Sequence, residues 1–246
     1  MDEVLYLMAT ALILTSNSPR HIYFANKMAQ TFDVAGIISE PKNDYFEKQI
    51  EESELVKNHF ENLFTYENKY LGEFTSFPCT PVLSIDKNEI NEAKTLKWAK
   101  EKNADVILLF GTGILSELWL TPYKNRVVNL HLGYSPRYRG SATLFWPFVN
   151  DELEFVGATI HLAELKVDAG AIIKIITPNI LQQDNYYDIS FKTIKKAIEE
   201  FPVAVQDFLD GKLQPFLQKI DDQKFHYRKK DFTEEVLKMV MEKYGP

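Results

Sequence analysis

An amide and an imidazole stand two residues apart near the middle of the chain, at Asn129 and His131. They lie at the end of the apolar run 127–132, which has the length of a strand, and side chains two residues apart on a strand point to the same face. There the amide can donate a hydrogen bond to a developing oxyanion and the imidazole can accept a proton. The pair therefore suits acyl transfer, although an isolated Asn-x-His pair is more often a buried polar pair bonded to the backbone.

Two further features follow this pair. The segment 135–140 reads Ser-Pro-Arg-Tyr-Arg-Gly and forms a rigid loop that ends in glycine. Asp168 comes later, in a short connection where Gly170 permits unusual backbone angles. A carboxylate near an imidazole raises the pKa of the imidazole and fixes its tautomer. We therefore interpret Asn129, His131 and Asp168 as a candidate catalytic group.

Apolar runs of strand length alternate with helical patterns and predict the framework that positions these residues. The predicted strands are 9–15, 34–39, 81–85, 106–110, 127–132, 158–164 and 171–178. The predicted helices are one that begins at Ser18 and Pro19, one or two surface helices in 43–70, and single helices over 89–103, over 189–209 and from about Thr233. This alternation is typical of an α/β fold with a Rossmann-like, mostly parallel, twisted sheet flanked by helices. Such sheets bind ligands beyond the carboxyl ends of their strands.

The chain divides in this interpretation into a catalytic domain, 1–212, and a small C-terminal appendage, 213–246. The appendage contains an aromatic and basic stretch, 225–230, which could face a ligand but is expected to form an exposed strand or hairpin. The amphipathic helices are compatible with a homodimer, yet such helices more often pack on their own domain.

Four motifs occur in a fixed order. They are Asn129-Leu-His131, Pro136-Arg-Tyr-Arg-Gly140, Gly157-Ala-Thr159 and Asp168-Ala-Gly-Ala-Ile172. In types and spacing they resemble the folate-dependent formyltransferases, the family that includes glycinamide ribonucleotide, methionyl-tRNA and nucleotide-sugar formyltransferases. The segment Gly113-Ile-Leu-Ser116 resembles the loop of that family whose backbone receives the pterin ring. The resemblance is strong over 104–180 and weak over the first 40 residues.

This resemblance implies that 10-formyltetrahydrofolate donates a formyl group to a primary amine. Asn129 would steady the oxyanion, His131 would accept a proton or stabilise charge, and Asp168 would set the charge state of the histidine and relay protons through water. No metal is required, because the formyl carbon is an ordinary acyl centre. The residues expected to bind the folate are Gly111, Gly113, Ile114, Leu115, Val167 and Gly170. The residues expected to bind the amine substrate are Asn17, Arg20, Arg137, Tyr138, Arg139 and Gly140.

The identity of the amine depends on departures from the family pattern. Glycinamide ribonucleotide enzymes hold a phosphate in a glycine-rich loop after the first strand, whereas 15–20 here contains no glycine and has a proline without a donor. A methionyl-tRNA enzyme would have a basic surface and a longer C-terminal domain. A nucleotide-linked amino sugar, a precursor of cell-surface polysaccharide, therefore fits best. The alternatives are a glycinamide ribonucleotide formyltransferase and a formyltetrahydrofolate hydrolase, which would use the same three residues.

The composition of the chain argues against several other classes of protein. A net charge of −7 argues against nucleic-acid binding, which needs a basic surface. The apolar run 4–15 is shorter than the roughly 20 residues of a membrane span, and the single Cys79 fits a reducing cytoplasmic setting. Two remote alternatives are a non-catalytic ligand-binding module and a metal site formed by His131, His161 and Asp168.

Overall fold

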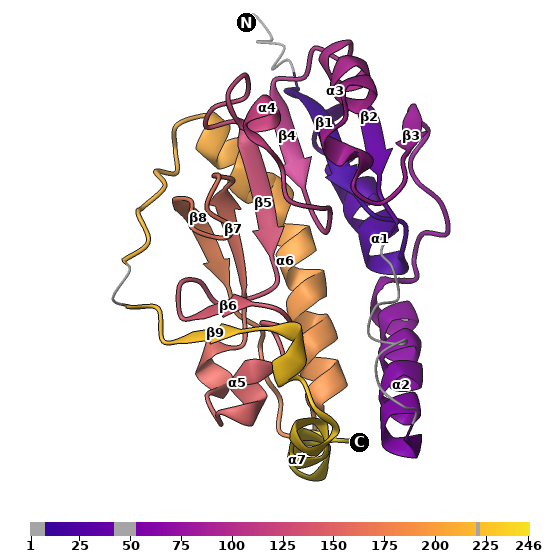
Figure 1. Cartoon of the computed structure of the whole chain (residues 1–246), viewed down its shortest axis with the longest axis vertical. Helices are drawn as coiled ribbons and strands as arrows, with labels where there is room; N and C mark the ends of the chain where they lie inside the picture. The colour runs from indigo at the N-terminus through magenta and orange to yellow at the C-terminus, as the bar shows by residue number, and fades with distance from the viewer. Residues whose placement is uncertain (1–7, 42–52, 220–221) are drawn as a thin grey trace, which may run out of the picture.

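The computed structural model describes residues 8–41, 53–219 and 222–246. A seven-stranded sheet in the order β3-β2-β1-β4-β5-β7-β8 forms its centre (Figure 1). The strands are β1 (Thr10–Thr15), β2 (Asp33–Ser39), β3 (Val82–Ser84), β4 (Val106–Leu109), β5 (Val127–His131), β7 (Ala158–Leu162) and β8 (Ile172–Ile176). The strands β1 to β5 run parallel to one another, and β7 pairs antiparallel with both β5 and β8. The predicted mostly parallel α/β fold is confirmed.

Helices cover both faces of this sheet. They are α1 (Pro19–Met28), α2 (Glu54–Leu71), α3 (Ala93–Lys100), α4 (Glu117–Leu120), α5 (Trp146–Val149), α6 (Tyr186–Leu209) and α7 (Glu234–Tyr244). Alternate residues of β1 enter two separate cores, because successive strand side chains point to opposite faces. Ala11 and Ile13 pack with α1 and α6, whereas Leu12 and Leu14 pack with residues from α3 and α4. No helix in the part of the chain that the structure describes has the length and apolar content of a membrane span.

Two predicted helices differ from the structure at their ends. The predicted helix 89–103 is instead a 3-10 turn, Glu89–Asn91, followed by α3, because Glu92 adopts an extended conformation and interrupts the helix. The helix predicted over 189–209 begins three residues earlier, since the Asn185 side chain accepts hydrogen bonds from the amides of Tyr187 and Asp188. Of the helices predicted in 43–70, the part over 43–52 lies outside the described residues. The rest belongs to α2, which Ser53 caps.

The C-terminal segment contains the clearest departure from the sequence-based expectation. The stretch β9 (Phe225–Tyr227) forms no hairpin but pairs in parallel with β6 (Tyr138–Gly140), so 138–140 is a short strand and not a loop. At Gly140, φ is +100° and a Cβ atom would lie 1.9 Å from the Tyr227 carbonyl oxygen, so glycine is required there. The division of the chain at residue 212 stays a prediction. The helix α7 packs against α2, α5 and α6 of the main body.

A substitution of Leu237 tests how much the packing of α7 contributes to the stability of the fold. Its side chain is fully buried, whereas Met239 on the same helix is 57% exposed. Leu237→Ala should lower the free energy of unfolding by about 2–5 kcal/mol, because the cavity adds to the lost transfer energy. Urea unfolding followed by circular dichroism measures this, with Met239→Ala as the control. Equal effects of the two substitutions would show that α7 does not pack as the structure has it.

Candidate active site

The three predicted catalytic residues converge at one edge of the sheet. Asn129 and His131 end β5, and Asp168 lies in the connection between β7 and β8. The Oδ1 atom of Asp168 is 3.4 Å from Nδ1 of His131 and 3.7 Å from Nε2 of His161. Because β5 and β7 pair directly, Asn129 faces His161 and His131 faces Thr159 across the strands. Residues from motifs that are separated in the sequence thus lie close together in the fold.

Asp168 reaches this position through a sharply folded connection. The chain leaves β7 beside Val127, whose carbonyl accepts the amide of Ala163, and must turn back to bring Asp168 toward His131. Asp168 takes a left-handed backbone with φ of 52°, which non-glycine residues seldom adopt. A Cβ atom on Gly170 would lie 1.8 Å from the Leu162 carbonyl oxygen. Gly170 therefore allows the close return that Asp168 needs.

His131 is held in a mostly buried position between a carboxylate and a hydroxyl. Its Nε2 atom lies 3.4 Å from Oγ1 of Thr143, whose hydroxyl donates to the Leu132 carbonyl at 2.5 Å. A Cβ atom on Gly133 would approach Nε2 to 2.5 Å, so the absent side chain leaves space for the ring. Burial lowers the pKa of His131, and the charge of Asp168 only partly opposes this. The imidazole is therefore neutral near pH 7 and able to accept a proton.

Asp168 retains its negative charge in this setting. Burial by itself would raise its pKa, but the neighbouring rings of His161 and His131 and the guanidinium of Arg139 outweigh burial and lower the pKa. An ionised carboxylate beside His131 can stabilise the imidazolium that forms when the ring takes a proton. The pair is thus arranged for proton transfer.

His161 orients the Asn129 amide. Its Nδ1–H donates to the Leu162 carbonyl at 2.8 Å, which leaves Nε2 to accept a hydrogen bond from Nδ2 of Asn129 at 3.0 Å. One amide N–H is thereby fixed, and the second remains to donate to a substrate oxygen. With both ring nitrogens engaged, His161 is poorly placed as a metal ligand. Across the described residues, no three His, Cys, Asp or Glu side chains are grouped to hold a metal.

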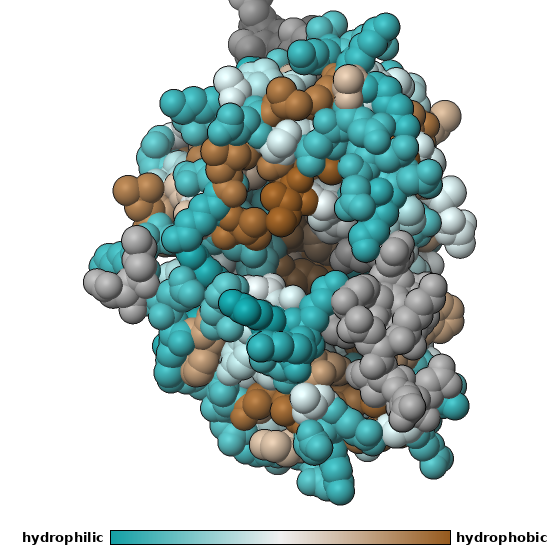
Figure 2. All heavy atoms as spheres, in the orientation of Figure 1, coloured by the Kyte–Doolittle hydropathy of each residue, from teal (hydrophilic) through white to brown (hydrophobic). Residues whose placement is uncertain are grey.

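A small cavity of about 120 Å³ adjoins these residues. Asn129, His161 and Asp168 line it, as do five of the six predicted folate contacts: Gly111, Gly113, Ile114, Leu115 and Val167. Ile114 is 69% exposed and Val167 is 50% exposed, so both contribute accessible apolar surface to the cavity. Gly170 does not line the cavity. Figure 2 shows hydrophobic residues bordering a hollow in the middle of one face.

The loop that forms one wall of this cavity is tied to residues that sequence reasoning missed. The buried Glu40, just after β2, accepts a 2.6 Å hydrogen bond from the amide of Gly113. The Asn91 side chain donates to the Ile114 carbonyl and accepts from the amide of Ser116, each at 2.9 Å. The loop is therefore preformed. Neither residue lies in a motif, so only the fold reveals these contacts.

The predicted substrate-binding residues fall into two groups. Asn17 is exposed after β1, and Arg20 in α1 makes a two-pronged ion pair with Glu67. The other group lies on and before β6, where Arg137 and the buried Tyr138 both donate to Glu152. Arg139 donates to Gln218 and Gln223, and Gly140 packs against Tyr227. Most of these polar groups thus have partners within the protein.

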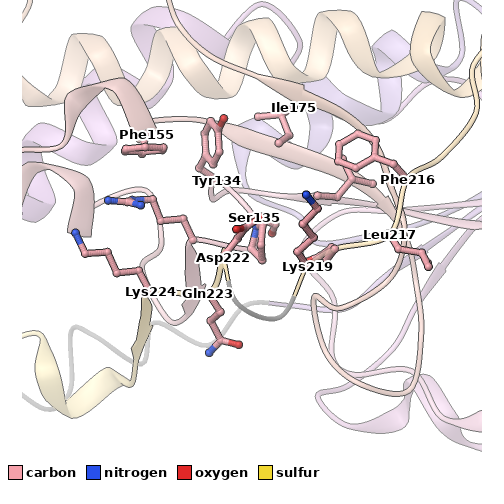
Figure 3. Close-up of a pocket in the computed structure, with 14 residues that line it drawn as sticks. Tyr134, Ser135, Phe155, Ile175, Phe216, Leu217, Lys219, Asp222, Gln223 and Lys224 are labelled. Carbon is pink, nitrogen blue, oxygen red and sulfur yellow. The ribbon is translucent and has the colours of Figure 1, made fainter.

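A second, larger cavity of about 920 Å³ lies beside the β6 group. Tyr134 and Phe155 lie on one side and Phe216 and Leu217 on the other, as Figure 3 shows. The Arg137 guanidinium stacks 3.9 Å over the Phe155 ring. None of the three candidate catalytic residues lines this cavity, so it is separate from their site.

The fold and this site agree with the comparisons. The family model described as "Formyl transferase" matches residues 11–205, and the chain belongs to this family. Methionyl-tRNA formyltransferase of Listeria welshimeri is 25% identical over 214 residues, which cover 85% of this chain and 62% of the relative. The enzyme of that name from Synechocystis is 32% identical over 127 residues, covering 51% and 38%. The chain thus spans less than two-thirds of the length of these relatives.

Solved structures with the same fold include enzymes for different substrates. Glycinamide ribonucleotide transformylase 1 from Symbiobacterium toebii has a TM-score of 0.60 at 18% identity, covering 88% of this chain and 99% of that one. A formyltransferase from Anoxybacillus kamchatkensis, solved with UDP-4,6-dideoxy-4-formamido-L-AltNAc and tetrahydrofolate, has a TM-score of 0.52 at 18% identity, covering 96% and 94%. At these identities the likeness establishes the fold.

The contacts of His131 predict how its ring titrates. Its pKa should lie below the ordinary 6.5, and Asp168→Asn should lower it further, because the nearby carboxylate stabilises the protonated ring. NMR titration of the ring protons measures both values, with the signal assigned by its absence in His131→Asn. A His131 pKa above 6.5, or one unchanged by Asp168→Asn, would contradict the geometry.

Proposed function

We propose that this protein transfers a formyl group from 10-formyltetrahydrofolate to a primary amine. The observation that carries this proposal is the convergence of the Asn129 amide, the His131 imidazole and the Asp168 carboxylate beside a preformed cavity. The amine nitrogen attacks the formyl carbon, and the bond from that carbon to N10 of the folate then breaks. The products are a formamide and tetrahydrofolate.

Each of the three side chains has a role that follows from its contacts. The free N–H of Asn129 donates to the oxyanion of the tetrahedral intermediate, since His161 already holds the other. The neutral His131 takes the proton that the attacking amine loses, and Asp168 stabilises the resulting imidazolium. N10 of the folate takes up a proton as it leaves. The reaction needs positioning and oxyanion stabilisation, and no covalent enzyme intermediate.

The cavity beside Asn129 is the proposed folate site. The loop 111–115 and Val167 offer apolar side chains and backbone groups to a flat heterocycle, and Gly170 supports the loop that carries Asp168. Glu40 and Asn91 hold the first loop in place before any ligand arrives, which limits the entropy lost on binding.

For the acceptor we favour a nucleotide-linked amino sugar. The β1–α1 loop offers no glycine-rich cradle for the phosphate of glycinamide ribonucleotide, and Pro19 at the start of α1 lacks an N–H. The net charge of −7 disfavours a transfer RNA. Asn17, Arg20 and the residues Arg137–Gly140 remain the proposed acceptor contacts.

Mixing the protein with 10-formyltetrahydrofolate and a panel of amines tests this assignment. The panel contains amino-sugar nucleotides, glycinamide ribonucleotide and methionyl-tRNA, and mass spectrometry detects the gain of one formyl group. We expect formylation of an amino-sugar nucleotide. Formylation of glycinamide ribonucleotide or methionyl-tRNA alone would refute the acceptor, and release of formate without any formylated amine would indicate hydrolysis.

Replacing the proposed proton acceptor tests the mechanism. His131→Asn should abolish turnover or lower kcat by about 100-fold to 10,000-fold, because asparagine cannot take up the proton of the attacking amine. Binding of the folate, followed by calorimetry, should persist and serves as the control for a correctly folded site. Turnover at the parental rate would overturn the role of His131.

A further inference from the structure

One glutamine from the C-terminal segment contacts the connection that carries Asp168. Nε2 of Gln218 donates to the carbonyl of Asp168 at 2.9 Å and to the carbonyl of Gly170 at 2.7 Å. These carbonyls belong to residues two positions apart. The side-chain amide of Gln218 therefore holds the left-handed Asp168 and the glycine that follows it in one fixed arrangement. Residue 218 lies outside the 11–205 region that the family model matches.

Arg139 sets the orientation of this glutamine. Nη2 of Arg139 donates to Oε1 of Gln218 at 2.8 Å. An arginine can only donate and a backbone carbonyl can only accept, so the oxygen of the glutamine must face Arg139 and its nitrogen must face the Asp168 bend. Arg139 is itself only 7% exposed, and its Nη1 donates to Gln223. The side chain of Gln218 therefore has one satisfied orientation.

The backbone near Gln218 is attached to the sheet as well. The amide of Ile172 in β8 donates to the Phe216 carbonyl at 2.8 Å, and the amide of Phe216 donates back at 2.9 Å. This two-way bridge places the segment 216–218 against the strand that begins just after the Asp168 bend. Gln218 also lines the larger cavity, as do its neighbours Phe216 and Leu217.

We propose that Gln218 is a positioning residue for the reaction, which holds the Asp168 bend so that the carboxylate stays beside His131. The chain must fold back from the end of β7 to bring Asp168 there, and a left-handed non-glycine residue does not favour that conformation by itself. Gln218 supplies the missing restraint from outside the core motifs, and Arg139 orients Gln218. This inference rests on the proposed role of Asp168.

Two substitutions of Gln218 test the restraint. Gln218→Met keeps the length of the side chain but removes all three hydrogen bonds. Gln218→Glu keeps an acceptor for Arg139 but removes both donors to the bend. Each should lower kcat about tenfold or more, because small displacements of a catalytic group are costly, while KM for the folate stays at the parental value. Full kcat in Gln218→Glu would show that the bend needs no donor and would overturn the proposal.

The titration of His131 gives a readout that does not depend on turnover. Gln218→Met should shift the His131 titration to lower pH, since Asp168 moves away from the ring. In an Asp168→Asn background the same substitution should cause no further shift, because the carboxylate through which it acts is absent. An equal shift in both backgrounds would show a general structural effect and would contradict positioning.

Gln214→Met is the matched control, because Gln214 is an exposed glutamine of the same segment that donates only to the Gly211 carbonyl. It should retain the parental kcat and the parental His131 titration. If Asp168→Asn retains parental turnover, the proposed catalytic roles fail. If Asp168→Asn loses turnover while Gln218→Met keeps parental kcat and titration, the catalytic roles stand and the positioning role of Gln218 is wrong.

Discussion

The antiparallel pairing of β5 with β7 is the constraint on which the site depends. Without it, His161 would not lie beside Asn129, and the amide would have no fixed orientation. The same pairing creates a difficulty, because β7 ends beside Val127, away from the carboxyl end of β5 where His131 lies. The connection to β8 must return along the strand. The left-handed Asp168, the absent side chain of Gly170 and the contact with Gln218 are the means of that return.

Burial and charge together determine the protonation states of His131 and Asp168. Burial would leave an isolated imidazole too weak a base to hold a proton, and it would leave an isolated carboxyl group neutral. Placed 3.4 Å apart, each opposes the effect of burial on the other. The result is a neutral base that becomes more basic wherever the carboxylate is close. Small movements of the Asp168 bend therefore change chemistry as well as structure.

The features that depend on local periodicity or on the motifs could be predicted from the sequence. It predicted the strands and the mostly parallel sheet, and its motifs singled out three residues that lie together in the fold, because apolar alternation and motif order are properties of neighbouring residues. It failed where partners are remote. The strands β6 and β9 have three residues each, too few for a periodic pattern, and their paired residues are 87 positions apart in the sequence. Glu40 and Gln218 act on loops 73 and 50 residues away, and no local pattern marks such contacts.

The acceptor residues illustrate why charge in a sequence does not translate directly into charge at a site. Arg20 and Arg137 were predicted to bind the amine substrate, yet Glu67 and Glu152 each occupy two donors of the respective guanidinium. An arginine carries five N–H donors, so Arg20 and Arg137 each retain donors for a ligand. The positive charge of each guanidinium, however, is already balanced by the paired glutamate. Recognition of an anionic acceptor there would rest on directed hydrogen bonds more than on net attraction. Such recognition depends on geometry, and it would weaken little as salt concentration rises.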